Sequence, residues 1–208
     1  MARRPGIALQ AISLVVAGSI VYMYTLITAP RRRIETFLRD VAAVEVGRTE
    51  LANWLAQVER DGNTKFVPAC EAQSCSVGME VESNVLPALR IAPKMSAWVY
   101  VSFSAGVASL IHINLWSLRR DASGQWIDDK GVVVAQTVGR SLGCSQQYSV
   151  KINVPDKFRG GRWAAVDMDS CVSSEERSRA FAINTSCLTR IGACETPREM
   201  LPEVFGQQ

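Results

Sequence analysis

The sequence predicts an α+β protein in which an N-terminal transmembrane helix and a membrane-proximal amphipathic helix precede an antiparallel β-sandwich-like domain with disulfides. Three observations support this fold class. Residues 7–29 carry no charged side chain, hydrophobic residues recur at helical spacing over residues 31–61, and residues 65–196 contain short segments rich in β-branched and aromatic residues. Residues 1–6 then form a short basic tail, and residues 197–208 a C-terminal tail.

Residues 7–29 have the length and composition of a membrane anchor. About 23 residues, at a helical rise of about 1.5 Å each, are enough to cross a hydrocarbon core of about 30 Å. A secretory signal peptide has a shorter apolar core, of about 7–15 residues, followed by a cleavage site with small residues. Because Thr28-Ala29-Pro30 is a poor version of such a site, we expect a retained single-pass anchor.

Charge alone does not orient this anchor. Arg3 and Arg4 precede it and the run 31–33 follows it, so the count of basic residues is nearly equal on its two sides. All the cysteines, however, lie beyond residue 69, which favours an oxidising compartment for that side. We therefore expect an extracytoplasmic C-terminal domain, periplasmic or on the cell surface. The cysteines are Cys70, Cys75, Cys144, Cys171, Cys187 and Cys194.

Six cysteines permit 15 pairings, and closeness in the sequence favours one of them. The expected bridges are Cys70–Cys75, Cys187–Cys194 and, by elimination, Cys144–Cys171. Zinc is the rival interpretation, but the tight pair has four intervening residues and His112 is the only histidine. No haem-attachment motif is present either, so we expect no metal and no cofactor. Buried free thiols remain an alternative to disulfides.

Hydrophobic residues in the segment 31–61 alternate at spacings of three and four, which is typical of an amphipathic helix. Asp61-Gly62-Asn63 supplies a stop. Two interpretations follow: the helix covers part of the distal domain, or it is a stalk that pairs with a second copy or with a partner subunit. The candidate interaction residues on this stripe are Ile34, Phe37, Val41, Val44, Leu51, Trp54, Leu55 and Val58.

The distal segment, residues 65–196, changes to a period of two. Short candidate strands separated by turn residues indicate an antiparallel sandwich. The expected strands are Val77–Val85, Ala97–Ser104, Leu110–Leu118, Val132–Val138, Gln147–Val154, Arg162–Asp169 and Arg179–Thr185.

Catalytic residues are not evident in the sequence. His112 alternates with isoleucines in an expected strand, which is typical of a structural histidine, and no nucleophile elbow, phosphate loop or metalloprotease motif occurs. Two carboxylate pairs, 128–129 and 167–169, fit solvated strand ends better than a calcium or acid–base site. Four tryptophans lie in or beside strands, where they serve either the core or a surface that grips sugars or proteins. They are Trp98, Trp116, Trp126 and Trp163.

The net charge of +3 is concentrated beside the anchor, and this distribution limits the classes of partner. The arginines there suit lipid headgroups, and the balanced remainder excludes the basic stripe of a nucleic-acid-binding surface. We therefore expect contacts with membrane lipids and with other protein subunits or further copies of the chain, and none with nucleic acid.

The first 60 or so residues also resemble the N-terminal region of type IV pilin-like proteins. A basic leader ends at Gly6, a hydrophobic helix starts at Ile7, and this helix continues through Pro30 toward a β domain with cysteines. The resemblance implies removal of the leader after Gly6. The fifth residue of the mature chain would then be Ala11, where that family usually has glutamate.

Together these features predict a non-enzymatic, membrane-anchored accessory or scaffold subunit, whose extracytoplasmic β domain binds other proteins of a membrane or envelope complex. Two alternatives remain open: a type IV pilin-like subunit with its leader cleaved after Gly6, and an extracytoplasmic sensor domain that binds a ligand or a sugar.

Overall fold

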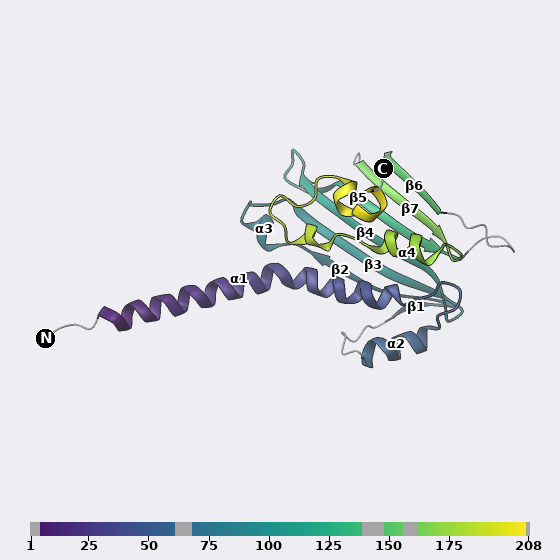
Figure 1. Ribbon diagram of the computed structural model, residues 1–208, viewed down its shortest axis with the longest axis horizontal. Coiled ribbons are helices and arrows are strands. Elements are labelled where there is room, and N and C mark those ends of the chain that lie inside the picture. The colour runs from purple at the N-terminus through teal and green to yellow at the C-terminus, as the bar shows by residue number, and fades with distance from the viewer. Residues whose placement is uncertain (1–4, 61–67, 139–147, 156–161, 207–208) are drawn as a thin grey trace.

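A computed structural model describes residues 5–60, 68–138, 148–155 and 162–206. It shows one long helix that projects from a domain built on a single β-sheet (Figure 1). The first half of the helix stands clear of the domain, and the second half lies along the sheet.

Helix α1 spans Pro5–Ala42, 38 residues, and continues through Pro30 without a break. Proline removes one helical hydrogen bond and here does not end the helix. Side chains before Pro30 are largely exposed, as with Leu14 at 74%, whereas Phe37 in the second half is only 1% exposed. In the described part of the chain, α1 alone is long and apolar enough to cross a membrane.

The sheet has seven strands in the order β1-β2-β3-β4-β5-β7-β6. All neighbouring strands are antiparallel except β5 and β7, which run parallel because β6 forms the edge beyond β7. Alternate residues point to the two faces, and the buried face contains the apolar residues of β2 to β5 and β7. The strands are β1 Ala69–Glu71, β2 Ser74–Glu82, β3 Lys94–Ser104, β4 Val107–Arg120, β5 Trp126–Thr137, β6 Tyr148–Pro155 and β7 Arg162–Asp169.

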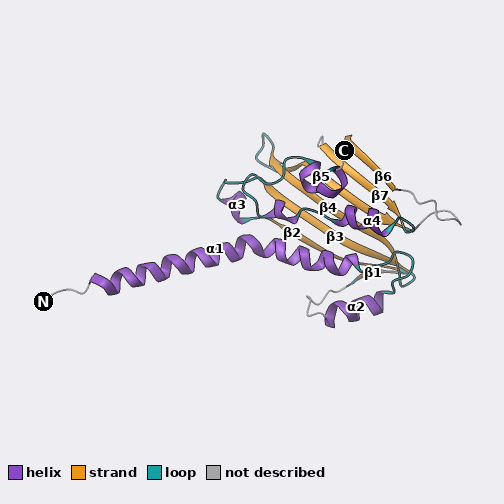
Figure 2. Cartoon of the chain, in the orientation of Figure 1, coloured by secondary structure: helices purple, strands orange, loops and turns teal. Residues whose placement is uncertain are grey.

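The structure does not confirm the expected sandwich, because the described strands form one sheet. The second half of α1 and the C-terminal helices pack on the apolar face of this sheet (Figure 2). Alternation in a strand requires a cover for one face but does not say whether that cover is a sheet or a helix. The remaining helical elements are α2 Leu51–Arg60, α3 Val85–Ala88, α4 Ser174–Phe181, η1 Thr185–Leu188, α5 Pro197–Met200 and α6 Pro202–Phe205.

Two C-terminal expectations were wrong. The segment 179–185 is the end of α4 and the start of η1 rather than a strand, because Ser173 caps α4 by accepting a hydrogen bond from the backbone N–H of Glu176. Residues 197–206 are not a tail: they form α5 and α6, and Met200, Leu201 and Phe205 are buried.

The amphipathic segment 31–61 is also not one helix. It divides into the end of α1 and the separate α2, joined by a loop over residues 43–50. Gly47 adopts a φ of +86° in this loop, a left-handed conformation that glycine takes without steric cost. Its N–H donates to the carbonyl of Ala108 at 2.7 Å, so the loop is fastened to the start of β4.

Two of the expected disulfides are present. Cys70–Cys75 joins β1 to β2, and Cys187–Cys194 joins η1 to the loop before α5. Cys171 is disulfide-bonded as well, whereas Cys144, its expected partner, lies outside the described residues.

Arg177 of α4 fastens the C-terminal end of α1 to the sheet. Its guanidinium donates to the carbonyl oxygens of Ala42 at 2.8 Å and Val44 at 2.7 Å, and to Oε1 of Gln136 on β5 at 3.0 Å. The last carbonyls of a helix have no partners within it, so one planar cation supplies donors to the end of α1 and fixes it against β5 and α4.

We expect Arg177→Ala to lower the free energy of unfolding by about 2–4 kcal/mol, because hydrogen bonds to charged groups contribute about 1.5–3 kcal/mol each and the carbonyls lose their donors. Urea unfolding followed by tryptophan fluorescence measures this change. Arg177→Lys should recover only part of it, since an ammonium cannot reproduce the guanidinium fork. Ser178→Ala, on the same helix with an exposed side chain, is the control, and a loss equal to that of Arg177→Ala would refute the role of Arg177.

Candidate functional site

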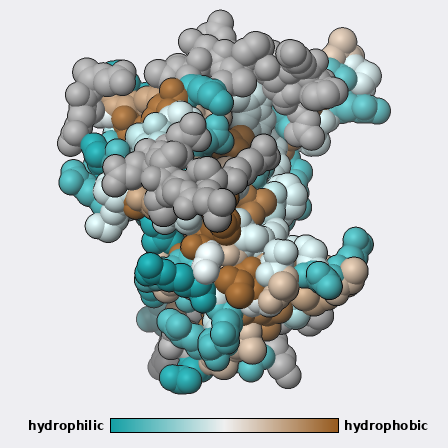
Figure 3. Space-filling model, turned by 90° about the vertical axis from the view of Figure 1, so that its right-hand side faces the viewer, coloured by the Kyte–Doolittle hydropathy of each residue, from teal (hydrophilic) through white to brown (hydrophobic). Residues whose placement is uncertain are grey.

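The described surface offers two features that could carry function: the exposed half of α1, and the face of the sheet opposite α1. Most of the large apolar side chains of α1 from Ile12 to Leu26 are exposed. By contrast, the end of the domain farthest from the N-terminus shows interspersed hydrophilic and hydrophobic residues (Figure 3). Large contiguous apolar surface on one element marks contact with a membrane or with protein.

The candidate interaction residues on the amphipathic stripe belong to the protein's own core. Six of the eight are buried, and Leu51 and Leu55 are partly buried against the same cluster. The stripe therefore covers the β domain, as the first of the two interpretations expected. The six buried residues are Ile34, Phe37, Val41, Val44, Trp54 and Val58.

A groove of about 590 Å³ opens where α1 leaves the domain. Pro30 and Arg33 line it from the helix, and Glu80 and Glu82 line it from β2. Glu82 forms an ion pair with Lys94, with Nζ of the lysine 2.8 Å from Oε2 of the glutamate. The groove thus has charged walls of both signs next to the first turns of the exposed apolar helix.

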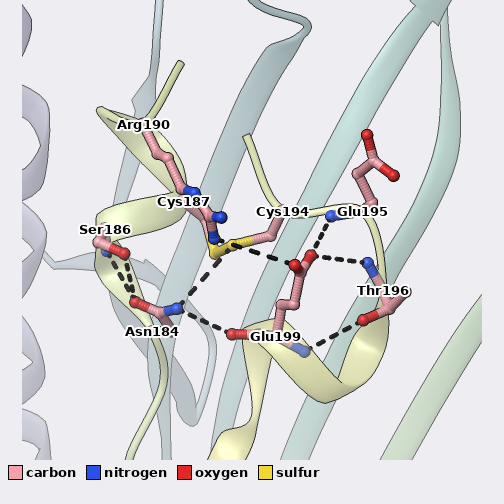
Figure 4. A network of polar contacts seen from close by, with 8 residues as sticks. All are labelled: Asn184, Ser186, Cys187, Arg190, Cys194, Glu195, Thr196 and Glu199. Carbon is pink, nitrogen blue, oxygen red and sulfur yellow. Dashed lines mark hydrogen bonds and ion pairs between the residues drawn. A yellow bond between two sulfur atoms is a disulfide. The ribbon is translucent and has the colours of Figure 1, made fainter. Parts of the chain in front are cut away.

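Polar contacts around Cys187–Cys194 connect the parts of the C-terminal segment (Figure 4). The side chain of Thr196 accepts a hydrogen bond from the backbone N–H of Glu199, and the side chain of Glu199 accepts one from the backbone N–H of Thr196, which together form a capping box at the start of α5. Asn184, the asparagine of the sequence Asn184-Thr185-Ser186, donates through Nδ2 to the carbonyl of Glu199 at 2.9 Å. This amide is therefore engaged in holding η1 against α5.

The open face of the sheet carries a line of rings across β3 and β4. Trp98 and Tyr100 have ring centroids 4.7 Å apart, and Tyr100 stacks on His112 at 4.9 Å. Nε2 of His112 donates to Oδ1 of Asn114 at 3.1 Å. Burial lowers the pKa of His112, although the Asn114 hydrogen bond and the charge of Asp167 act in the opposite direction. The imidazole is therefore neutral at pH 7.

Beside this line lies a second groove, of about 280 Å³, lined by Glu80, Trp98, Asn114, Trp116 and Trp163. These residues come from β2, β3, β4 and β7. The pairings Glu80 with Trp98 and Trp98 with Asn114 place three of them in one row across the sheet.

Gly131 leaves room for two of the tryptophans that line this groove. It pairs with Trp116 on one side and Trp163 on the other. A Cβ atom at this position would lie 2.6 Å from Cβ of Trp116 and 2.8 Å from Cζ3 of Trp163, far inside van der Waals contact. Glycine therefore lets two indole rings converge over β5.

The sequence-predicted carboxylate pairs do not form a shared site. Asp129 pairs with Arg119 at 3.2 Å and Asp167 with Lys151 at 3.3 Å. Asp169 is buried and accepts a hydrogen bond from Ser170 at 3.1 Å. Within the described ranges, no group of three histidine, cysteine or acidic side chains is arranged to hold a metal.

Sequence reasoning identified the tryptophans of this face one by one but missed Glu80, Asn114 and Gly131. The signal for Asn114 was its place two residues from His112 and from Trp116 on the same strand face. Trp163 lies next to Trp116 only because β7 pairs in parallel with β5, and no local pattern in the sequence predicts that pairing.

Comparison with protein-family models, with curated proteins and with solved structures finds no match for this chain.

We expect Cys187→Ala combined with Cys194→Ala to lower the free energy of unfolding by about 2–4 kcal/mol. This bridge is buried among core residues and orders a segment with little other regular structure. Cys70→Ala with Cys75→Ala is the matched control. We expect it to cost less, because β1–β2 pairing already sets these two residues opposite each other near the surface. Urea unfolding of the two double variants in one detergent measures both free energies of unfolding. An equal or larger loss of this free energy for the control pair would contradict this account.

Proposed function

We propose that the protein is a non-enzymatic, membrane-anchored subunit that holds its β domain on the extracytoplasmic face of a membrane, where it assembles with other proteins. The observation that carries the proposal is the division of α1. One continuous helix has an exposed apolar first half and a second half buried in the domain.

The anchor part of the proposal rests on hydration. Side chains such as Leu14, Ile20 and Val21 are more than half exposed, and leaving so many apolar side chains in water is unfavourable by about 25 cal/mol for each Å² of apolar surface. A lipid bilayer or the helices of other subunits would remove this surface from water. The extracytoplasmic placement is supported by the disulfides, which persist in oxidising compartments.

The assembly part of the proposal rests on the rigid connection between anchor and domain. The end of α1 is fixed by the packing of Phe37 in the core beside the sheet and by the hydrogen bonds from Arg177. A domain joined to its anchor without a flexible linker has a defined position relative to the membrane. Such a position suits a subunit that contacts fixed neighbours better than it suits a tethered enzyme.

A photo-crosslinking amino acid at Ile20 tests this function in the native membrane. Ile20 is 64% exposed, so we expect irradiation to give discrete protein adducts, of a second copy or of another subunit, identified by mass spectrometry. The same amino acid at Phe37, which is 1% exposed, is the matched control and should give only attachment within the chain. Lipid adducts alone at Ile20, together with recovery as a lone monomer in mild detergent, would refute the assembly role.

A type IV pilin-like subunit is the second candidate, and one observation favours it. The helix that starts beside Gly6 continues through Pro30 and lies along a sheet that carries cysteines, which is the layout on which the sequence resemblance rests. Ala11, in place of the glutamate usual in that family, is the departure from it.

Intact-mass measurement of the protein from its native membrane tests this second candidate. A pilin-like subunit should begin at Ile7, with residues 1–6 removed. Gly6→Leu should block that removal and leave the full-length mass, whereas Ala2→Leu, distant from the junction, should not. A wild-type chain that retains residues 1–6 would rule the pilin-like function out.

A further inference from the structure

We propose that the groove lined by Glu80, Trp98, Asn114, Trp116 and Trp163 binds a neutral saccharide. This inference goes beyond the proposed function, because it concerns the open face of the sheet and does not depend on whether α1 anchors or assembles the protein.

The aromatic wall of the groove is exposed and stiff. Trp98 is 41% exposed, a large value for a tryptophan in the middle of a strand. Its contact with Tyr100 and the stack of Tyr100 on His112 hold the rings in place. The faces of aromatic rings are negative and attract groups of positive partial charge. The C–H bonds on the apolar face of a pyranose ring are such groups, so an indole wall suits a sugar ring.

The polar groups of the groove suit hydroxyl groups. Oδ1 of Asn114 already accepts from His112, so its NH₂ remains as a donor, while the carboxylate of Glu80 is an acceptor. The indole N–H groups of Trp116 and Trp163 have no acceptor among the described residues, although Trp163 is only 9% exposed. A buried unpaired donor costs about 1–3 kcal/mol. A sugar hydroxyl can accept a hydrogen bond from the NH₂ of Asn114, and another can donate to the carboxylate of Glu80.

Charge and size narrow the class of sugar. Glu80 is the one charged residue among the described residues that line the groove, and the neighbouring His112 is neutral because burial lowers its pKa. An acidic sugar would meet a carboxylate and no cation there. The volume of about 280 Å³ lies just below the range of about 300–1,000 Å³ that is typical of drug-sized ligands, which suits one or two sugar rings.

A quaternary ammonium ion is the main competitor, because indole rings and a carboxylate also attract cations. It offers no hydrogen-bond acceptor, however, and would leave the NH₂ of Asn114 unpaired. The Asn114 donor therefore favours a saccharide.

The experiment uses the full chain, labelled with ¹⁵N at the indole nitrogens, in micelles of a polyoxyethylene detergent that has no sugar headgroup. The probes are lactose, maltose, cellobiose and N,N′-diacetylchitobiose at millimolar concentrations, with sialyllactose and tetramethylammonium as charged comparisons. We expect at least one neutral disaccharide to shift the indole resonances of Trp98, Trp116 and Trp163 saturably, and to leave that of Trp126 unchanged.

Trp98→Ala should weaken this binding by about tenfold or more, the effect of losing one aromatic stacking surface. Trp98→Phe, which keeps a ring, should recover part of the affinity and guards against a folding defect in the alanine variant. Trp126→Ala is the matched control: Trp126 is 37% exposed and lies outside the groove, so this variant should bind as the wild type does.

Three results would overturn the proposal. One is that no neutral disaccharide shifts the three indoles, and another is that Trp98→Ala binds as tightly as Trp126→Ala. The third is that tetramethylammonium binds more tightly than every neutral sugar and displaces them, which would make the groove a cation site.

Discussion

The structure depends on the packing of the second half of α1 against the sheet. Trp54 of α2 shows how tightly this contact is built, since its ring lies 6.3 Å from Phe37 of α1 and 5.6 Å from Phe103 of β3, and its indole donates to the carbonyl of Asp40 at 3.2 Å. Without α1, the part of the apolar face formed by β2 and β3 would be open to water. Replacing Phe37 by a small residue would cost about 3–5 kcal/mol, a large part of the stability of a domain.

This packing explains why the other half of the same helix can stay exposed. A helix that belongs to the core at one end cannot fold its other end back onto the domain without bending, and the helix does not break at Pro30. The apolar surface from Ile12 to Leu26 is therefore presented outward by the fold. The proposed anchoring and assembly follow from that presentation, and the proposed saccharide would bind on the opposite face of the sheet.

Local patterns in the sequence predicted the elements better than their arrangement. The charge-free stretch 7–29 and the alternating strands were predictable because both patterns are local: a long apolar run indicates a helix able to cross a membrane, and alternation indicates a strand with one buried face. The short loops between cysteines indicated Cys70–Cys75 and Cys187–Cys194. The break at Gly47 was missed because the apolar stripe continues across it in a separate helix. The groove was missed as a unit because Trp163 reaches it only through the parallel pairing of β5 with β7.

The most direct test of the account is the environment of α1 along its length, measured by the oxygen and nickel accessibility of spin labels in lipid nanodiscs. The account predicts that labels at residues 14–24 are protected from the aqueous nickel reagent whatever side of the helix they occupy, and that those facing lipid are accessible to oxygen. From residue 34 onward, protection should recur with a helical period, as Ile34, Phe37 and Val41 face the sheet. Helical periodicity with nickel access over residues 14–24 would show that this half lies on an aqueous surface, and would contradict the anchor.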